Sequence, residues 1–75
     1  MAREWISEET EALLRFLDLA IEASALVFDI NAEIASFAMM AALVAAEELG
    51  ISDEAAYHMR DSALEVKRRC AAARH

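Results

Sequence analysis

The sequence feature that most constrains the fold is Ile34–Ala46, an uncharged segment in which every residue but one serine is apolar. It lies within a longer pattern, from Leu13 to Val44, in which apolar residues recur every three and four positions. This spacing places their side chains along one face of a helix and is typical of helices that pack along a seam. The predicted seam consists of Leu13, Phe16, Ala20, Ala23, Val27, Ile30, Ile34, Phe37, Ala41 and Val44, with Leu17 on its flank.

We expect this pattern to form one long helix over residues 8–49. Polar residues on its opposite side keep a seven-residue spacing, which an uninterrupted helix would produce. This polar stripe contains Glu8, Arg15, Glu22, Asp29 and Ser36, with Glu11 and Asp18 beside it. Ser7 is the predicted N-cap of the helix, and Gly50 is the residue at which we expect the helix to end.

A shorter helix is predicted over residues 53–73, after a turn at residues 50–52. Its apolar positions, again three and four apart, are Ala56, Met59, Ala63, Val66, Cys70 and Ala73. Residues 1–7 form a leader in this interpretation, and we expect Trp5 to fold back onto the helices. Because the chain has no proline and a single glycine, we predict one all-α domain over residues 1–75.

The two predicted helices differ in length, at about 63 Å and about 31 Å for a rise of ~1.5 Å per residue. If the shorter helix folds back antiparallel, it reaches only Asp29–Ile30, and several large apolar residues stay uncovered. Full burial of each such side chain contributes roughly 1.5–3 kcal/mol, which is large against the ~5–15 kcal/mol by which domains are stable. We therefore expect a helical hairpin that self-associates, in the simplest case as a dimeric four-helix bundle with two-fold symmetry.

A break in the long helix is the alternative. Residues Val27–Asn31 have the weakest helix propensity in the segment, and Asn31 could cap a new helix. The chain would then form a three-helix bundle from nearly equal helices over residues 8–28, 32–49 and 53–73. The regular spacing of the polar stripe favours the continuous helix.

No arrangement of residues in the sequence indicates catalysis, so we predict a protein that is not an enzyme. The best candidate metal ligands are Glu54, His58 and Asp61, which share a helix face, but metal sites in helical bundles more often use a Glu-x-x-His spacing. We expect these three residues to form a solvated polar face, and no cofactor is predicted. Cys70 has no histidine placed to activate it, and we predict that it is a small buried apolar residue.

Charge is distributed unevenly along the chain, which has a net charge of −7. Residues 1–54 contain twelve acidic and two basic residues, whereas residues 55–75 contain two acidic and five basic residues. We interpret the basic segment as a complement to helix C-termini and to the acidic segment. The acidity of the whole chain argues against nucleic-acid binding.

Association with a membrane is not expected. Ile34–Ala46 is shorter than the ~20 residues that a transmembrane helix requires, and anionic lipids would repel an acidic helix face. A lone cysteine suits a reducing compartment, so we predict a cytoplasmic protein.

These observations predict a small acidic interaction or regulatory protein that acts through homo-oligomeric helical packing, with a dimer favoured. One alternative is a small inhibitor of a larger protein, or a mimic of nucleic acid, that uses an acidic helix face. The acidic residues predicted to face such a partner are Glu11, Asp18, Glu22 and Asp29. A second alternative is a helix-bundle carrier of a metal or cofactor.

Overall fold

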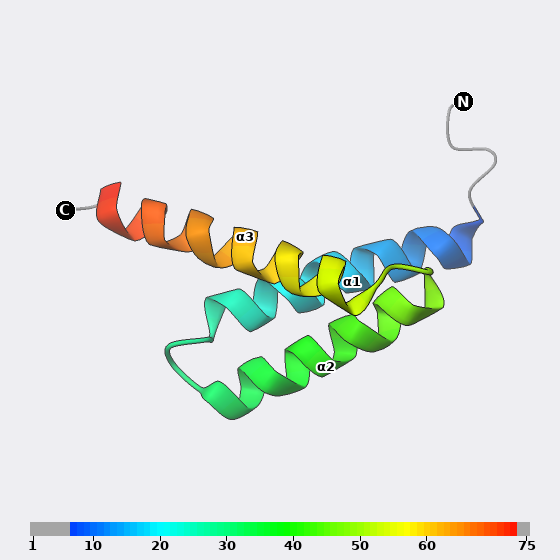
Figure 1. The fold of residues 1–75 in the computed structure, drawn as a ribbon, viewed down its shortest axis with the longest axis horizontal. Helices are drawn as coiled ribbons and strands as arrows, with labels where there is room; N and C mark the ends of the chain where they lie inside the picture. Colours follow the sequence, from blue (N-terminus) through cyan, green and yellow to red (C-terminus); the bar gives the residue numbers. More distant parts are fainter. Residues whose placement is uncertain (1–6, 74–75) are drawn as a thin grey trace.

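The computed structural model describes residues 7–73, which form three helices and contain no strand (Figure 1). The helices are α1 (Glu8–Leu26), α2 (Ala32–Glu48) and α3 (Asp53–Ala73). The prediction of an all-helical chain is confirmed over this range. Trp5 lies outside the described residues, as do the other residues of 1–6 and 74–75, so the expectation for Trp5 stays a prediction.

The prediction of one continuous helix over residues 8–49 is wrong, because α1 ends at Leu26 and the chain turns before α2 begins. The amides of Ile30 and Asn31 donate to the carbonyl of Val27, at 3.0 and 2.8 Å, and close the turn. The turn occupies the segment of weakest helix propensity. The alternative prediction, in which the helix breaks at Val27–Asn31, is confirmed for the position of the break.

Asn31 determines where α2 begins. Its side-chain oxygen accepts hydrogen bonds from the backbone N–H groups of Glu33 and Ile34, both at 3.1 Å. The first amides of a helix have no partner within the helix, so a capping side chain stabilises the new start. The break in the helix is therefore stabilised by a specific interaction, in addition to the low propensity of the turn residues.

The other predicted helix ends also agree with the structure. The Ser7 hydroxyl accepts from the amide of Thr10 at 3.1 Å and caps α1. Gly50 follows α2 with a φ of 73°, a conformation that favours glycine. The Ser52 hydroxyl accepts from the amide of Ala55 at 3.2 Å at the start of α3.

The helices pack around a core made mainly of small side chains. α1 and α2 run antiparallel, and α3 lies across α1, running in the same direction, with its C-terminal end beyond the α1–α2 turn in this view (Figure 1). α3 makes more extensive contact with α1 than it makes with α2. The core consists of Leu17, Ala20 and Ile21 from α1, Met39, Ala42, Ala45 and Ala46 from α2, and Ala56 from α3.

The molecule is flat, with extents of 44 × 28 × 18 Å. An α-helix with its side chains is about 10 Å across, so the thinnest dimension is about two helices deep. Each helix therefore keeps one side toward solvent. Since the chain is rich in apolar residues, the composition of these outer sides decides what the protein can contact.

Replacing Asn31 by alanine removes the acceptor for two amides at the start of α2. We expect the free energy of unfolding to fall by about 1 kcal/mol, because loss of an N-cap side chain typically costs ~0.5–2 kcal/mol. Urea unfolding followed by circular dichroism measures this change. Asn31→Ser keeps a capping oxygen and serves as the control. An equal loss of stability in Asn31→Ser would show that capping is not the reason.

Candidate functional site

A row of large apolar side chains on α2 faces solvent. Ile34, Phe37 and Val44 are 53%, 69% and 63% exposed, and Ala41 lies between them, partly buried. Their spacing of three and four residues places all four on one face of the helix. The opposite face of α2 packs into the core with the residues Ala35, Met39, Ala42 and Ala46. α2 therefore has two apolar faces, one that packs into the core and one that faces solvent.

α1 carries a second exposed apolar row, which includes Phe16, Leu19 and Ala23. Rotation along the helix by about 100° per residue places Phe16 and Ala23 next to the core residue Ala20. This is the side of α1 away from Ile21, which lines the contact with α3. The two rows therefore lie on the side of the α1–α2 pair away from α3. We call Phe16, Leu19, Ala23, Ile34, Phe37, Ala41 and Val44 the apolar surface.

The predicted seam divides between the core and this surface. Leu17 and Ala20 are buried, whereas Leu13, Val27 and Ala41 are partly buried. The exposed members are Phe16, Ala23, Ile30, Ile34, Phe37 and Val44. The prediction that these residues form one line along a single helix is wrong. The turn reverses the chain between α1 and α2, and it is mainly small residues of α2 that face the core. Ile30, in the turn, is 81% exposed.

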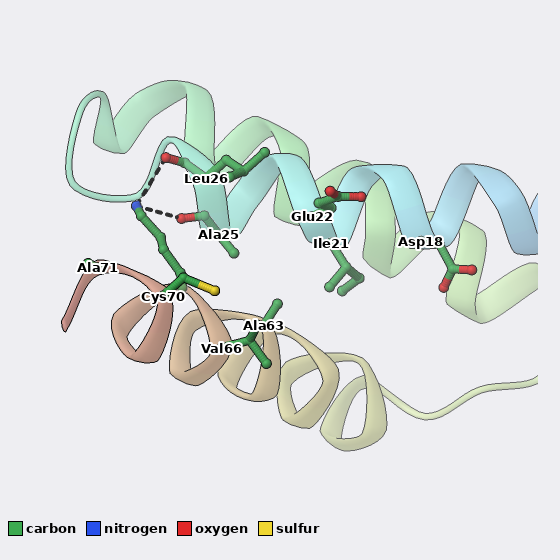
Figure 2. Close-up of a pocket in the computed structure, with 10 residues that line it drawn as sticks. Asp18, Ile21, Glu22, Ala25, Leu26, Ala63, Val66, Cys70 and Ala71 are labelled. Atoms are coloured by element: carbon green, nitrogen blue, oxygen red, sulfur yellow. Dashed lines mark hydrogen bonds between the residues drawn. The ribbon is translucent and has the colours of Figure 1, made fainter. Parts of the chain in front are cut away.

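A groove lies between α1 and α3 and has a volume of about 660 Å³ (Figure 2). Ile21 and Ala25 from α1 and Ala63 from α3 line its inner part, and Val66, which is 58% exposed, lies on its α3 side. The exposed carboxylates that line its α1 side belong to Asp18 and Glu22. The remaining lining residues are Leu26, Lys67, Cys70 and Ala71. The groove thus combines an apolar interior with an acidic rim.

The prediction that Cys70 is buried is wrong. The residue is exposed and lines the groove, where Figure 2 shows its sulfur on the side of α3 that faces α1. Its place on the apolar face of α3 was identified correctly. Burial fails because Lys67 already contacts Ala25 and Leu26 at the end of α1, and α3 continues past that end, so Cys70 has little of α1 beside it.

Lys67 links α3 to the end of α1. Its ammonium group donates to the carbonyls of Ala25 and Leu26, both at 3.0 Å, and lies 3.5 Å from the Asp29 carboxylate. The last four residues of α1 are Ala, Ser, Ala and Leu, so Lys67 supplies the positive charge that the C-terminal end of a helix favours. Sequence reasoning expected attraction between the two segments but did not identify this contact.

The predicted partner-facing acidic residues have different surroundings. Glu11 lies 3.8 Å from Arg15 within α1, and Asp29 lies beside Lys67 in the turn. Asp18 and Glu22 are exposed at the rim of the groove. Asp18 and Glu22 are therefore the two that border the groove between α1 and α3.

The candidate metal ligands Glu54, His58 and Asp61 are exposed on α3. Asp61 pairs with the neighbouring Arg60 at 3.1 Å. Within residues 7–73, no group of three His, Cys, Asp or Glu side chains is arranged to hold a metal ion. In the same part of the chain, no helix has both the length and the apolar character needed to cross a membrane.

Comparisons with protein-family models, with curated proteins and with solved structures find no match to this chain. The fold and its surfaces define the class of protein: a small all-helical chain that presents an apolar surface on one side and an acid-rimmed groove on another.

Replacing Lys67 by methionine keeps most of the side-chain volume and removes its charge. We expect the free energy of unfolding to fall by about 1–2 kcal/mol, because hydrogen bonds from a charged donor contribute roughly 1.5–3 kcal/mol and this side chain is partly solvated. Thermal unfolding measures the change. Arg68→Met removes the same charge from a side chain that is 74% exposed and is the matched control. Equal destabilisation by both variants would contradict the role given to Lys67.

Proposed function

We propose that this protein is a non-enzymatic interaction module whose apolar surface binds a second copy of the chain. The observation that supports this most is the solvent-facing row of Ile34, Phe37 and Val44, which the core does not use. Contiguous apolar patches of this kind on small proteins mark interaction sites. A two-fold homodimer is the simplest assembly that covers such a surface on every copy.

The central part of the row on α2, from Phe37 to Val44, is complementary to itself. A two-fold axis near Ala41 would place Phe37 of one copy against Val44 of the other and bring the two Ala41 residues together. Large residues would then flank a small one, which lets two helices approach closely and interlock their side chains. The row on α1, with Phe16 and Leu19, would extend the contact at both edges.

The apolar contribution outweighs the charge repulsion at the rim. Five large side chains per copy are exposed on the two rows, namely Phe16, Leu19, Ile34, Phe37 and Val44. Burying about half of each contributes roughly 1 kcal/mol per side chain, or on the order of 10 kcal/mol for two copies. Two solvated charges 4 Å apart repel by only about 1 kcal/mol. Association itself costs about 4–15 kcal/mol, so we expect a modest affinity.

A larger protein partner is the second candidate, and one observation favours it. α2 contains Glu33, Glu47 and Glu48 and no Lys or Arg, so the charges nearest the apolar row are acidic. A partner helix with basic residues beside its apolar face would complement this pattern, whereas two copies of the chain repel one another there. The two candidates therefore differ in their dependence on salt.

The double variant Ile34→Gln/Phe37→Gln tests the apolar surface. We expect the parent protein to be dimeric at tens of micromolar and the variant to be monomeric, because two of the largest contacts per copy become polar. Both residues are exposed, so the helical content should stay unchanged. Sedimentation equilibrium and far-ultraviolet circular dichroism measure these two properties. Tyr57→Gln, which changes an exposed aromatic residue on α3, is the control.

The result for the parent decides the proposal directly. A parent protein that stays monomeric at several hundred micromolar would overturn self-association through this surface. A variant that dimerises as well as the parent would place the interface elsewhere.

Self-association should strengthen as the salt concentration rises. Salt screens the acidic rims, since the Debye length falls from about 10 Å at 0.1 M to about 3 Å at 1 M, while apolar burial is not weakened by screening. Dimerisation constants measured by sedimentation at these two salt concentrations test this expectation. Binding to a basic partner would show the opposite trend. Dimers that dissociate at high salt would contradict an apolar contact with acidic edges.

A further inference from the structure

A second cavity lies between α2 and α3, separate from the apolar surface. The two helices are joined at Gly50 and move apart with distance from this turn (Figure 1). The cavity has a volume of about 410 Å³ and is lined by α2, by α3, and by Ser24 and Phe28 from α1 and the turn after it. Its volume falls in the range of ~300–1,000 Å³ that is typical of small-molecule sites. We propose that this cavity binds a small apolar carboxylic acid, with Arg60 holding the carboxylate.

The lining of the cavity indicates the chemistry of this ligand. Phe28, Met39, Met40 and Leu43 supply large apolar side chains, and Arg60 supplies a positive charge. Among the described residues that line the cavity, none is acidic, although the chain has a net charge of −7. An apolar space with one positive charge is complementary to an apolar body with one negative charge. A cationic ligand would meet a like charge there.

Arg60 has a donor that the protein leaves without an acceptor. Its Nη2 donates to the Asp61 carboxylate at 3.1 Å, whereas its Nε is buried and has no hydrogen-bond partner within residues 7–73. Its Cζ lies 5.9 Å from the ring centroid of Phe28 and 5.2 Å from that of Tyr57. The ring faces stabilise the charge but supply no oxygen that accepts from Nε. A buried donor without an acceptor costs free energy, so a ligand that brings an acceptor is favoured.

A carboxylate fits this guanidinium better than other acceptors do. Two adjacent N–H groups of an arginine match the two oxygens of a carboxylate, which gives a pair of parallel hydrogen bonds. Asp61 does not line the cavity, and its contact with Arg60 leaves Nε unpaired. The Asp61 side chain is 64% exposed, and ion pairs this exposed contribute little. Exchanging Asp61 for the carboxylate of a ligand therefore costs little and satisfies both nitrogens.

Binding requires Arg60 to move toward the cavity, because its Nε is enclosed. The neighbouring rings have room to give way, since Phe28 and Tyr57 are 44% and 41% exposed. Met39 and Met40, on the α2 side, have flexible side chains that adapt to ligands of different shape. We therefore expect the cavity to select the charge of a ligand strictly and the shape of its apolar body loosely.

The experiment uses octanoate as the probe and octanamide, which has the same chain without the charge, as the matched ligand. Titrations are followed by two-dimensional nuclear magnetic resonance of the labelled protein. We expect a dissociation constant of about 0.1–1 mM for octanoate and about tenfold weaker binding of octanamide. The backbone signals that shift should belong to the cavity residues, and the Nε–H signal of Arg60 should move downfield as it gains an acceptor.

Variants of Arg60 separate its charge from its shape. Arg60→Met should weaken octanoate binding by about tenfold and leave octanamide binding within about twofold, because only octanoate uses the charge. Arg60→Lys keeps the charge without the paired N–H groups and should lose about threefold. Arg68→Met removes the same charge from a side chain that is 74% exposed and does not line the cavity, so it is the matched control. Circular dichroism checks that each variant is folded.

Several outcomes would overturn the cavity site. Equal affinity of the parent protein for octanoate and octanamide would do so, as would an absence of binding at about 10 mM octanoate. A preference for octanoate that survives in a folded Arg60→Met or is fully kept in Arg60→Lys would show that Arg60 does not hold the carboxylate.

The Ile34→Gln/Phe37→Gln variant distinguishes the cavity from the apolar surface. It changes none of the residues that line the cavity, so it should bind octanoate to within about twofold of the parent. Loss of binding in this variant would place the probe on the apolar surface and overturn the cavity site. Self-association is measured without the probe, so a failure of dimerisation is recognised independently of this result.

Discussion

The turn between α1 and α2 is the constraint on which the rest of the structure depends, and it is stabilised at both ends. Asn31 accepts from two amides at the start of α2, and Lys67 donates to two carbonyls at the end of α1. These four hydrogen bonds satisfy groups that a helix end leaves unpaired. Because Lys67 belongs to α3, the turn and the position of α3 support each other. Local capping and tertiary packing therefore select the same structure.

The turn explains why a chain so rich in apolar residues still exposes many of them. Once α2 folds back along α1, its alanines face the core and allow the helices to approach closely, so its larger residues face outward. The hydrophobic content is thus shared between an inner contact made of small side chains and outer contacts made of large ones. On the proposed function, both sets are used, the first within one chain and the second between chains.

Sequence reasoning identified the all-helical class, the cap at Ser7, the helix end at Gly50 and the apolar face that now lies exposed on α2. It preferred a continuous helix because the polar residues keep a seven-residue spacing. That prediction was wrong because such a spacing can persist across a short turn. One contact that supports the turn comes from Lys67, about forty residues along the chain from its acceptors, and no local pattern reports it. The exposure of Cys70 was missed for a related reason, since it depends on where α3 crosses α1.

The alanine core has a consequence for how this chain tolerates mutation. Ala42, Ala46 and Ala56 are fully enclosed, and enlarging a side chain in such a site typically costs about 1–3 kcal/mol by overpacking. Phe37 and Val44, in contrast, can become polar without disturbing the fold of one chain. At these positions, the small side chains are therefore more sensitive for folding than the large ones. On the proposed function, the enclosed alanines matter for the folding of one chain, and the exposed large residues matter for its contact with a second copy.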